Sequence, residues 1–188
     1  MVTTTRRLAL CRLLAAAGVL WLRPVAAQPA PARSEYQIKA AYLFKFLGFV
    51  EWPQQAFDGP RAPLAVGVLG ADLLAEELAT IVSNRQVEGR PVMARRLRPD
   101  ESPAHLHALF VGRGSLGRLP ALLAQARGQA LLTITEAPDT PAEGSAINFI
   151  VVDNKVRFDV VLSAAEQMNL KVSARLLAVA RKVLPSPS

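Results

Sequence analysis

The middle of this chain alternates short apolar segments with amphipathic ones, and this order limits the folds that it can adopt. The apolar segments are typical of buried strands and cover residues 64–69, 92–97, 106–111 and 131–135. Helical patterns over 73–82 and 119–127 lie between them. Strands that alternate with helices, and that are apolar along most of their length, are characteristic of a parallel sheet covered on both faces. We therefore expect a parallel sheet at the centre of the molecule.

Two more apolar runs follow towards the C-terminus, at residues 147–152 and 156–162. Only Asp153-Asn154-Lys155 separates them, and Asp and Asn are turn formers. Two such runs joined by so short a turn predict an antiparallel hairpin. With a helical pattern after it, the hairpin completes the expected fold. This is an α/β three-layer sandwich with a mostly parallel sheet of about six strands, a C-terminal antiparallel hairpin, and helices on both faces.

The first 27 residues have the layout of a secretory signal peptide. Basic residues precede an apolar core at 13–22, and the small residues Val25-Ala26-Ala27 precede Gln28. The core is shorter than the roughly 20 residues that a membrane-spanning helix needs. We therefore expect cleavage near Ala27 and a periplasmic mature protein. An uncleaved anchor is the alternative, and the export route is left open.

The rest of the chain is expected to form one domain on a short tether. Residues 28–33 are predicted to be a flexible tether, and residues 34–184 a single α/β domain. Ser34 and Gln37 have the spacing of a capping box, which predicts a helix from Ser34 to about Phe49. This helix is apolar on nearly all sides, so we expect the domain to bury it. An exposed aromatic surface for a partner is the alternative.

Charge and cysteine content exclude two classes of function. The formal net charge is +7, and removal of the predicted signal peptide, with its four arginines and no acidic residue, lowers it to +3. The basic residues are scattered, so nucleic acid is not expected as a partner. The only cysteine, Cys11, lies in the predicted signal peptide. Thiol chemistry and cysteine-based zinc sites are therefore not expected in the mature protein.

No pattern typical of catalysis or metal binding stands out. His105 and His107 are expected on one face of a strand, but no third ligand accompanies them, so no metal site is predicted. Ser115, Ser145 and Ser163 lack a histidine placed to act as a base. We therefore predict that the protein is not an enzyme and holds no cofactor.

One glycine-rich segment matches a known ligand-binding pattern. Gly112-Arg113-Gly114-Ser115-Leu116-Gly117 matches the G-x-G-x-x-G pattern of dinucleotide-binding loops, with Glu136 in the place of the ribose-binding acid. Its position in mid-domain, and Pro120 in the next helix, favour an ordinary strand-to-helix turn. A weaker hypothesis is an anion site formed by backbone N–H groups and guanidinium groups. The residues of that hypothetical site are Gly112, Arg113, Gly114, Ser115 and Arg118.

Short motifs occur in a fixed order along nearly the whole expected domain. Near its start these are Lys39-Ala40-Ala41-Tyr42-Leu43 and Val50-Glu51-Trp52-Pro53. Near its end they are Ile147-Asn148-Phe149, Lys155-Val156-Arg157-Phe158-Asp159 and Leu170-Lys171-Val172-Ser173. Gly89-Arg90-Pro91-Val92 and Leu109-Phe110-Val111 lie between them. With these motifs, the chain resembles the YfiR-like family of periplasmic regulatory proteins from about Glu35 to Val183.

The resemblance implies a protein that binds and represses the periplasmic part of an inner-membrane diguanylate cyclase or a related sensor, such as a sensor kinase. Cyclic di-GMP and biofilm formation would fall as a result. The resemblance further implies that an outer-membrane lipoprotein takes part in release and that the protein is a homodimer. The best-studied type of member has paired cysteines. The mature chain here has none, so control through a disulfide is not expected.

The C-terminal hairpin is the predicted partner surface. An edge hairpin exposes one face, and the candidate contact residues Asn148, Phe149, Arg157 and Asp159 alternate along its strands. A hypothesis of a different class is a periplasmic small-ligand-binding domain. Its site would lie at the mouth formed by the carboxyl ends of the parallel strands.

Overall fold

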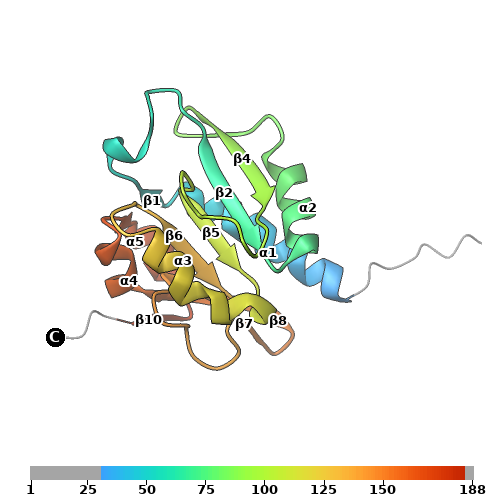
Figure 1. Cartoon of the computed structure of the whole chain (residues 1–188). Helices are drawn as coiled ribbons and strands as arrows, with labels where there is room; N and C mark the ends of the chain where they lie inside the picture. The colour runs from blue at the N-terminus through green and yellow to red at the C-terminus, as the bar shows by residue number, and fades with distance from the viewer. Residues whose placement is uncertain (1–30, 185–188) are drawn as a thin grey trace, which may run out of the picture.

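A computed structural model describes residues 31–184 of the chain (Figure 1). The predicted signal peptide at 1–27, and residues 28–30 of the predicted tether, lie outside the described residues. Helix α1, Pro31–Leu47, begins three residues before the expected start at Ser34, so residues 31–33 are helical rather than a tether. Proline is favoured in the first turn of a helix because its missing N–H would have no helical partner there.

A mixed sheet of eight strands forms the centre of the molecule, in the order β10-β8-β7-β6-β5-β2-β4-β3. The strands are β2 Leu64–Leu69, β3 Gln86–Val87, β4 Arg90–Arg96, β5 Ala108–Val111, β6 Leu132–Thr135, β7 Ile147–Val152, β8 Lys155–Val161 and β10 Lys182–Leu184. The central pairs from β4 to β7 are parallel, whereas β7 and β8 are antiparallel. The predicted α/β class, with its C-terminal antiparallel hairpin, is therefore confirmed. The two short edge strands, β3 and β10, were not predicted.

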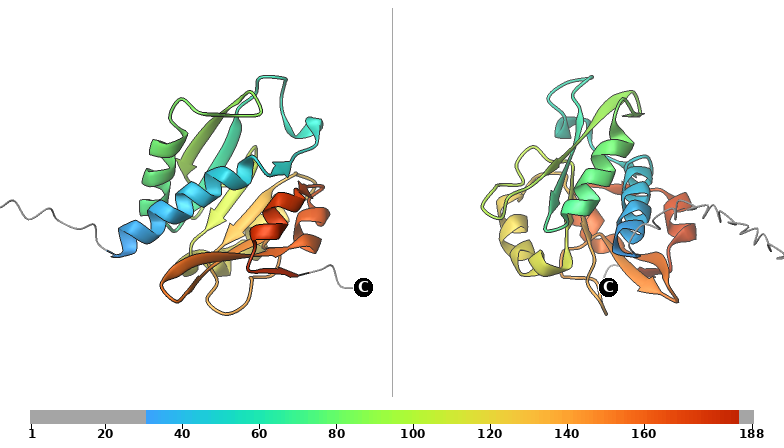
Figure 2. Two further views of the ribbon diagram at one scale, coloured as in Figure 1. Left: turned by 180° about the vertical axis from the view of Figure 1, so that it is seen from behind. Right: turned by 90° about the vertical axis from the view of Figure 1, so that its right-hand side faces the viewer.

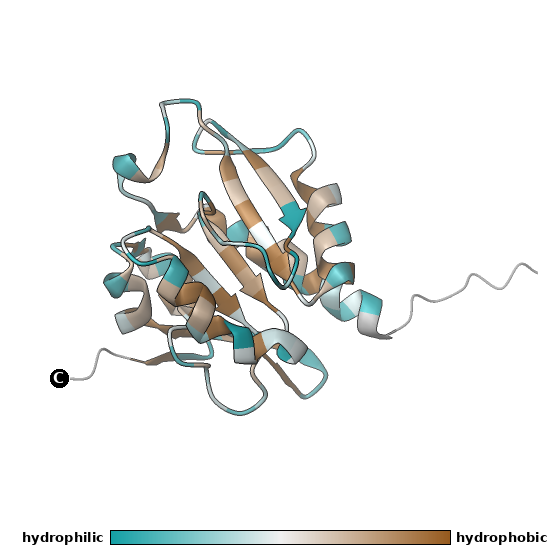
Figure 3. Ribbon diagram, viewed as in Figure 1, coloured by the Kyte–Doolittle hydropathy of each residue, from teal (hydrophilic) through white to brown (hydrophobic). Residues whose placement is uncertain are grey.

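Helices cover the two faces of the sheet unequally (Figure 2). In the right-hand view, α1 and α2, Asp72–Val82, lie on one face together with α4, Leu162–Gln167, and α5, Ala174–Val179. The 3₁₀ helix η2, Arg113–Arg118, and α3, Leu119–Gln125, lie on the other face. Each face has its own apolar cluster, and the cluster under α1 is much the larger. Figure 3 shows the apolar strands between these layers.

Helix α1 packs onto the sheet through aromatic side chains. Phe46 is buried and lies edge-on to Phe158 and stacked on Phe149, with ring centroids 4.8 and 5.5 Å apart. Tyr42 contacts the same two sheet residues. Burial of one such ring contributes roughly 1.5–3 kcal/mol. The domain thus buries one face of this helix, whereas Ile38 and Ala41 on its other side are exposed. The aromatic residues of the hairpin belong to the same core.

Two turns account for the main differences in strand boundaries. Asp153 and Asn154 both have positive φ, at 49° and 57°, as a type I′ hairpin turn requires. Strand β5 begins at Ala108 rather than at residue 106, because the chain turns at His105, where φ is 63°. A separate two-stranded ladder pairs β1, Val50–Glu51, with β9, Lys171–Val172. Strand β1 is followed in the chain by a 3₁₀ turn, η1, Gln54–Ala56.

Within residues 31–184, no helix has both the length and the apolar character needed to cross a membrane.

Candidate functional site

A buried ion cluster lies at the carboxyl ends of the parallel strands. Glu136 directly follows β6 and is only 5% exposed. Its Oε2 lies 2.5 Å from Nζ of Lys39, which is itself buried on α1. Lys39 also lies 2.5 Å from Oε1 of Glu35. A buried cation needs such partners, because desolvation without them costs several kcal/mol. The cluster therefore joins the start of α1 to the end of β6.

The second oxygen of Glu136 binds the glycine-rich loop. Oε1 of Glu136 accepts a hydrogen bond from the backbone N–H of Arg113 at 3.0 Å, and another from the hydroxyl of Tyr36 at 3.3 Å. Burial, and then the neighbouring Glu136 carboxylate, raise the pKa of Tyr36, so its phenol stays protonated. The acid that sequence spacing suggested for a ribose thus binds an N–H group of the loop itself.

The glycines of the loop do not act together as a phosphate cradle. A Cβ atom on Gly112 would lie 2.3 Å from the backbone oxygen of Gly70, so glycine is required there by the close approach of two loops. Gly114 and Gly117 have open space around them. Arg118 donates to the backbone oxygen of Pro99, and η2 is a 3₁₀ turn rather than the first turn of an α-helix. The anion site proposed from Gly112, Arg113, Gly114, Ser115 and Arg118 stays a prediction.

A second polar network lies between β6 and β7. Oδ1 of Asn148 accepts from the hydroxyl of Thr135 and from the backbone N–H of Ala137, both at 2.7 Å. Nδ2 of Asn148 donates to the Ala137 oxygen at 3.1 Å, and Ser145 completes the network through Thr135. Asn148 is fully buried. Its amide therefore fixes the loop that leaves β6.

The predicted contact surface on the hairpin is largely inside the molecule. Asn148, Phe149 and Asp159 are 0%, 1% and 2% exposed, and only Arg157 is exposed. We expected some of these side chains to point outward, but the first three are covered: Phe149 packs on Phe46 of α1, Asn148 binds Ala137 in the loop after β6, and Asp159 pairs with Arg181. Strand β6 flanks β7, and β10 pairs with β8.

Asp159 has a structural partner in the segment that leads into β10. Its two carboxylate oxygens accept from Nε and Nη2 of Arg181 at 2.8 and 2.5 Å. This bidentate hydrogen bond raises the pKa of the Arg181 guanidinium. The backbone N–H of Arg181 also donates to the Phe158 oxygen at 2.8 Å. The pair therefore holds β10 against β8.

A different cluster lies at the opposite edge, where the parallel strands begin. The ring of Phe57 stacks on the ring of His107 at 4.4 Å with an interplanar angle of 18°. The guanidinium of Arg90 lies 3.8 Å from the centroid of Phe57. Arg90 also donates to the backbone oxygens of Gly59 and Ala62 at 2.8 and 3.1 Å. We call Phe57, Arg90 and His107 the amino-edge stack; it fixes the segment between β1 and β2.

Both ring nitrogens of His107 are engaged. Nδ1 accepts from the backbone N–H of Ala65 at 3.1 Å, and Nε2 lies 3.0 Å from the oxygen of Ala56, to which it donates in the neutral ring. Burial lowers the pKa of His107 and favours this neutral form. His105 is exposed in the preceding turn, so the two histidines do not share a strand face. No group of three or more metal-ligating residues gathers within the described part of the chain.

Sequence reasoning missed the amino-edge stack. Trp52 and Arg90 belong to the motifs Val50-Glu51-Trp52-Pro53 and Gly89-Arg90-Pro91-Val92. Nε1 of Trp52 donates to the His107 oxygen at 3.0 Å. Those motifs could have suggested a shared structural role. Phe57 has no such signal, because its partners stand 33 and 50 positions away in the sequence.

Comparison with known proteins identifies the family of the chain. The model of the family described as YfiR/HmsC-like matches residues 36–181, which include the hairpin and both ends of the parallel strands. No curated protein matches the chain.

Proposed function

Because this chain belongs to the YfiR/HmsC-like family of periplasmic, non-catalytic regulators of cyclic di-GMP signalling, we propose that it binds and represses one membrane enzyme. The target is the periplasmic part of an inner-membrane diguanylate cyclase, or of a related sensor such as a sensor kinase. Binding lowers cyclic di-GMP and biofilm formation. The family match over residues 36–181 carries this proposal, since it spans nearly the whole described domain.

The burial of three predicted contact residues moves the proposed surface towards the end of the hairpin. Register places Ile150 opposite Arg157, and Val152 opposite Lys155, on one face of the hairpin. We call these four residues the hairpin-tip surface. Val152 is 37% exposed, and both basic residues are exposed. A mixture of apolar and basic groups suits a contact with an acidic, partly apolar protein surface.

Charge reversal at the hairpin tip tests the proposal. Arg157→Glu should raise cyclic di-GMP in cells several-fold, because a repulsive charge at a desolvated contact costs several kcal/mol of binding. Arg127→Glu is the matched control, since Arg127 is also exposed but lies after α3. Circular dichroism checks that both variants are folded. If Arg157→Glu represses as well as the parent protein, the hairpin-tip surface is wrong. If the parent protein itself leaves cyclic di-GMP unchanged, the regulatory function is wrong.

Two further parts of the proposal concern assembly. The resemblance favours a homodimer, and it favours an outer-membrane lipoprotein as the protein that relieves repression. Sedimentation of the purified protein tests the first part, and a single species at the monomer mass would contradict it. Co-purification with detergent-solubilised membrane proteins tests the second part and also identifies the cyclase or sensor.

A further inference from the structure

A cavity of about 690 Å³ opens at the amino edge of the sheet. Its walls come from residues 53–58 after β1, residues 104–106 before β5, residues 128–130 before β6, and Asn169 after α4. The volume lies within the range of about 300–1,000 Å³ that is usual for small-molecule sites. At the carboxyl edge, by contrast, the cavity beside Lys39 and Arg113 has a volume of about 90 Å³. The ligand mouth expected at the carboxyl ends is therefore much the smaller of the two.

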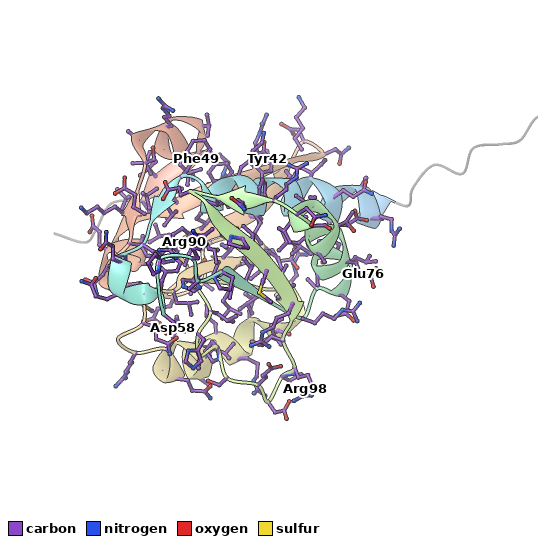
Figure 4. All side chains as sticks on the ribbon, turned by 90° about the horizontal axis from the view of Figure 1, so that it is seen from above. Tyr42, Phe49, Asp58, Glu76, Arg90 and Arg98 are labelled. Atoms are coloured by element: carbon purple, nitrogen blue, oxygen red, sulfur yellow. The ribbon has the colours of Figure 1, made fainter. Side chains whose placement is uncertain are left out.

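The wall formed by residues 53–58 is held rigidly. Phe57, inside this segment, lies between His107 and Arg90 in the amino-edge stack. Ala56 lines the cavity, and its oxygen is fixed by the ring of His107. Figure 4 looks down on this edge and shows Asp58 and Arg90 at the same end of the molecule. A ligand would therefore meet a preformed wall and would not have to order it, which lowers the cost of binding.

Three turns with left-handed backbone meet at the cavity. His105, Gly128 and Asn169 line it and have φ values of 63°, 80° and 55°. For residues other than glycine this conformation costs of order 1 kcal/mol or more, and it gathers at functional sites. These turns present His105 and Asn169 to the cavity from two different segments. The strain is thus found where the polar lining is built.

The polar side chains of the lining have free hydrogen-bonding capacity. These side chains are Gln55, Asp58, His105, Gln129 and Asn169. None of them makes a side-chain hydrogen bond or ion pair with another residue of the described chain. Leu106 and Ala56 are among the apolar residues of the same lining. Amide and carboxylate groups in such a mixed lining can bind several hydroxyl groups at once.

The charges of the lining restrict the ligand further. Asp58 is the one acidic residue among the described residues that line the cavity, and that lining contains no lysine or arginine. An anion would therefore meet a like charge, whereas an ammonium group would gain a charge-assisted hydrogen bond. We propose that this cavity binds a small polyhydroxylated amine of the amino-sugar class. Its ammonium group lies at Asp58 and its hydroxyl groups at the amides of Gln55, Gln129 and Asn169.

Calorimetry with three disaccharides tests the proposal. The probes are a glucosamine disaccharide with free amines, a neutral glucose disaccharide and a uronic acid disaccharide. We expect the amine to bind most tightly, the neutral sugar more weakly, and the acid least. Asp58→Asn keeps the shape of the side chain and removes its charge. It should weaken binding of the amine at least tenfold and leave the neutral sugar almost unchanged.

Two further variants complete the test. Asp139→Asn is the matched control, because Asp139 is an exposed aspartate in the loop after β6, at the other edge of the sheet. It should bind the amine as the parent protein does. Ala104→Trp should fill the cavity and abolish binding of every probe. The proposal fails if no probe binds at millimolar concentration, if the acid binds best, or if Asp58→Asn binds the amine with unchanged affinity.

Discussion

The two edges of the sheet use their polar residues in opposite ways. At the carboxyl edge, Glu136 is buried and gives its oxygens to Lys39, Tyr36 and the backbone of Arg113. At the amino edge, the stack holds the wall, and the polar side chains around the cavity keep their hydrogen-bonding groups free. Ligands of open α/β sheets usually bind at the carboxyl ends of the strands. Here that edge is filled by the chain's own side chains, so the free space lies at the other end.

The largest loss of stability is expected from a change at the carboxyl edge. Glu136→Leu leaves the buried Lys39 with the partly exposed Glu35 as its acidic partner and should lower the free energy of unfolding by roughly 3 kcal/mol. The double variant Lys39→Met/Glu136→Leu should recover part of the loss, because no buried charge is then unpaired. Urea unfolding measures both. Glu143→Leu, at an exposed site, is the control. Equal stability of the Glu136→Leu variant and the parent would show that this edge does not depend on the ion cluster.

A smaller loss of stability is expected at the amino edge. Phe57→Ala removes the middle ring of the amino-edge stack, and since Phe57 is only half-buried, the loss should be about 2 kcal/mol. The released segment should also become sensitive to proteases between β1 and β2. Phe44→Ala, at another half-buried ring beside an arginine, should lose similar stability without new cleavage there. Unchanged cleavage in Phe57→Ala would mean that the stack does not hold the wall.

The smallest expected effect is a pH dependence of stability that comes from His107, at the amino edge alone. The pKa of His107 is lowered in the folded protein, chiefly by burial and further by the charge of Arg90. The hydrogen bond to the Ala56 oxygen and the charge of Asp58 partly oppose this shift. The folded state therefore binds fewer protons than the unfolded state. The stabilising contribution of neutral His107 is complete above the unfolded pKa of about 6.5, and it is lost as pH falls from there through the folded pKa.

Chemical denaturation at a series of pH values measures this loss. As pH falls below about 6.5, the free energy of unfolding should decrease more steeply for the parent protein than for its His107→Gln variant. His105→Gln is the control, since His105 is exposed. Parallel pH profiles for the parent and His107→Gln would contradict the assignment.

Much of the sheet could be predicted from the sequence, because a strand that is buried on both faces needs a continuous apolar run. Residues 64–69 and 147–152 form strands with the predicted bounds. Strands β1, β9 and β10 have two or three residues each, too few for a periodic pattern. Because β10 was not predicted, its pairing with β8 was not expected. Asp159 was therefore expected on the surface, although it is buried beside Arg181.

The polar clusters were harder to predict, because spacing in the sequence does not show which partner a side chain finds. The interval from Gly117 to Glu136 fitted a nucleotide loop, but Glu136 binds Lys39, almost a hundred positions earlier. The amino-edge stack joins three segments through single residues. Only the fold brings Phe57 and His107 together.

The bridge between Asp159 and Arg181 has a consequence for the order of folding. Strand β10 follows every other described element in the chain, and Arg181, directly before it, pairs with a carboxylate that would otherwise be buried alone on β8. Without the segment around Arg181, the final packing of β8 would bury the Asp159 carboxylate without a charged partner, which is costly. We therefore expect the hairpin to reach its final packing only when this segment joins the sheet.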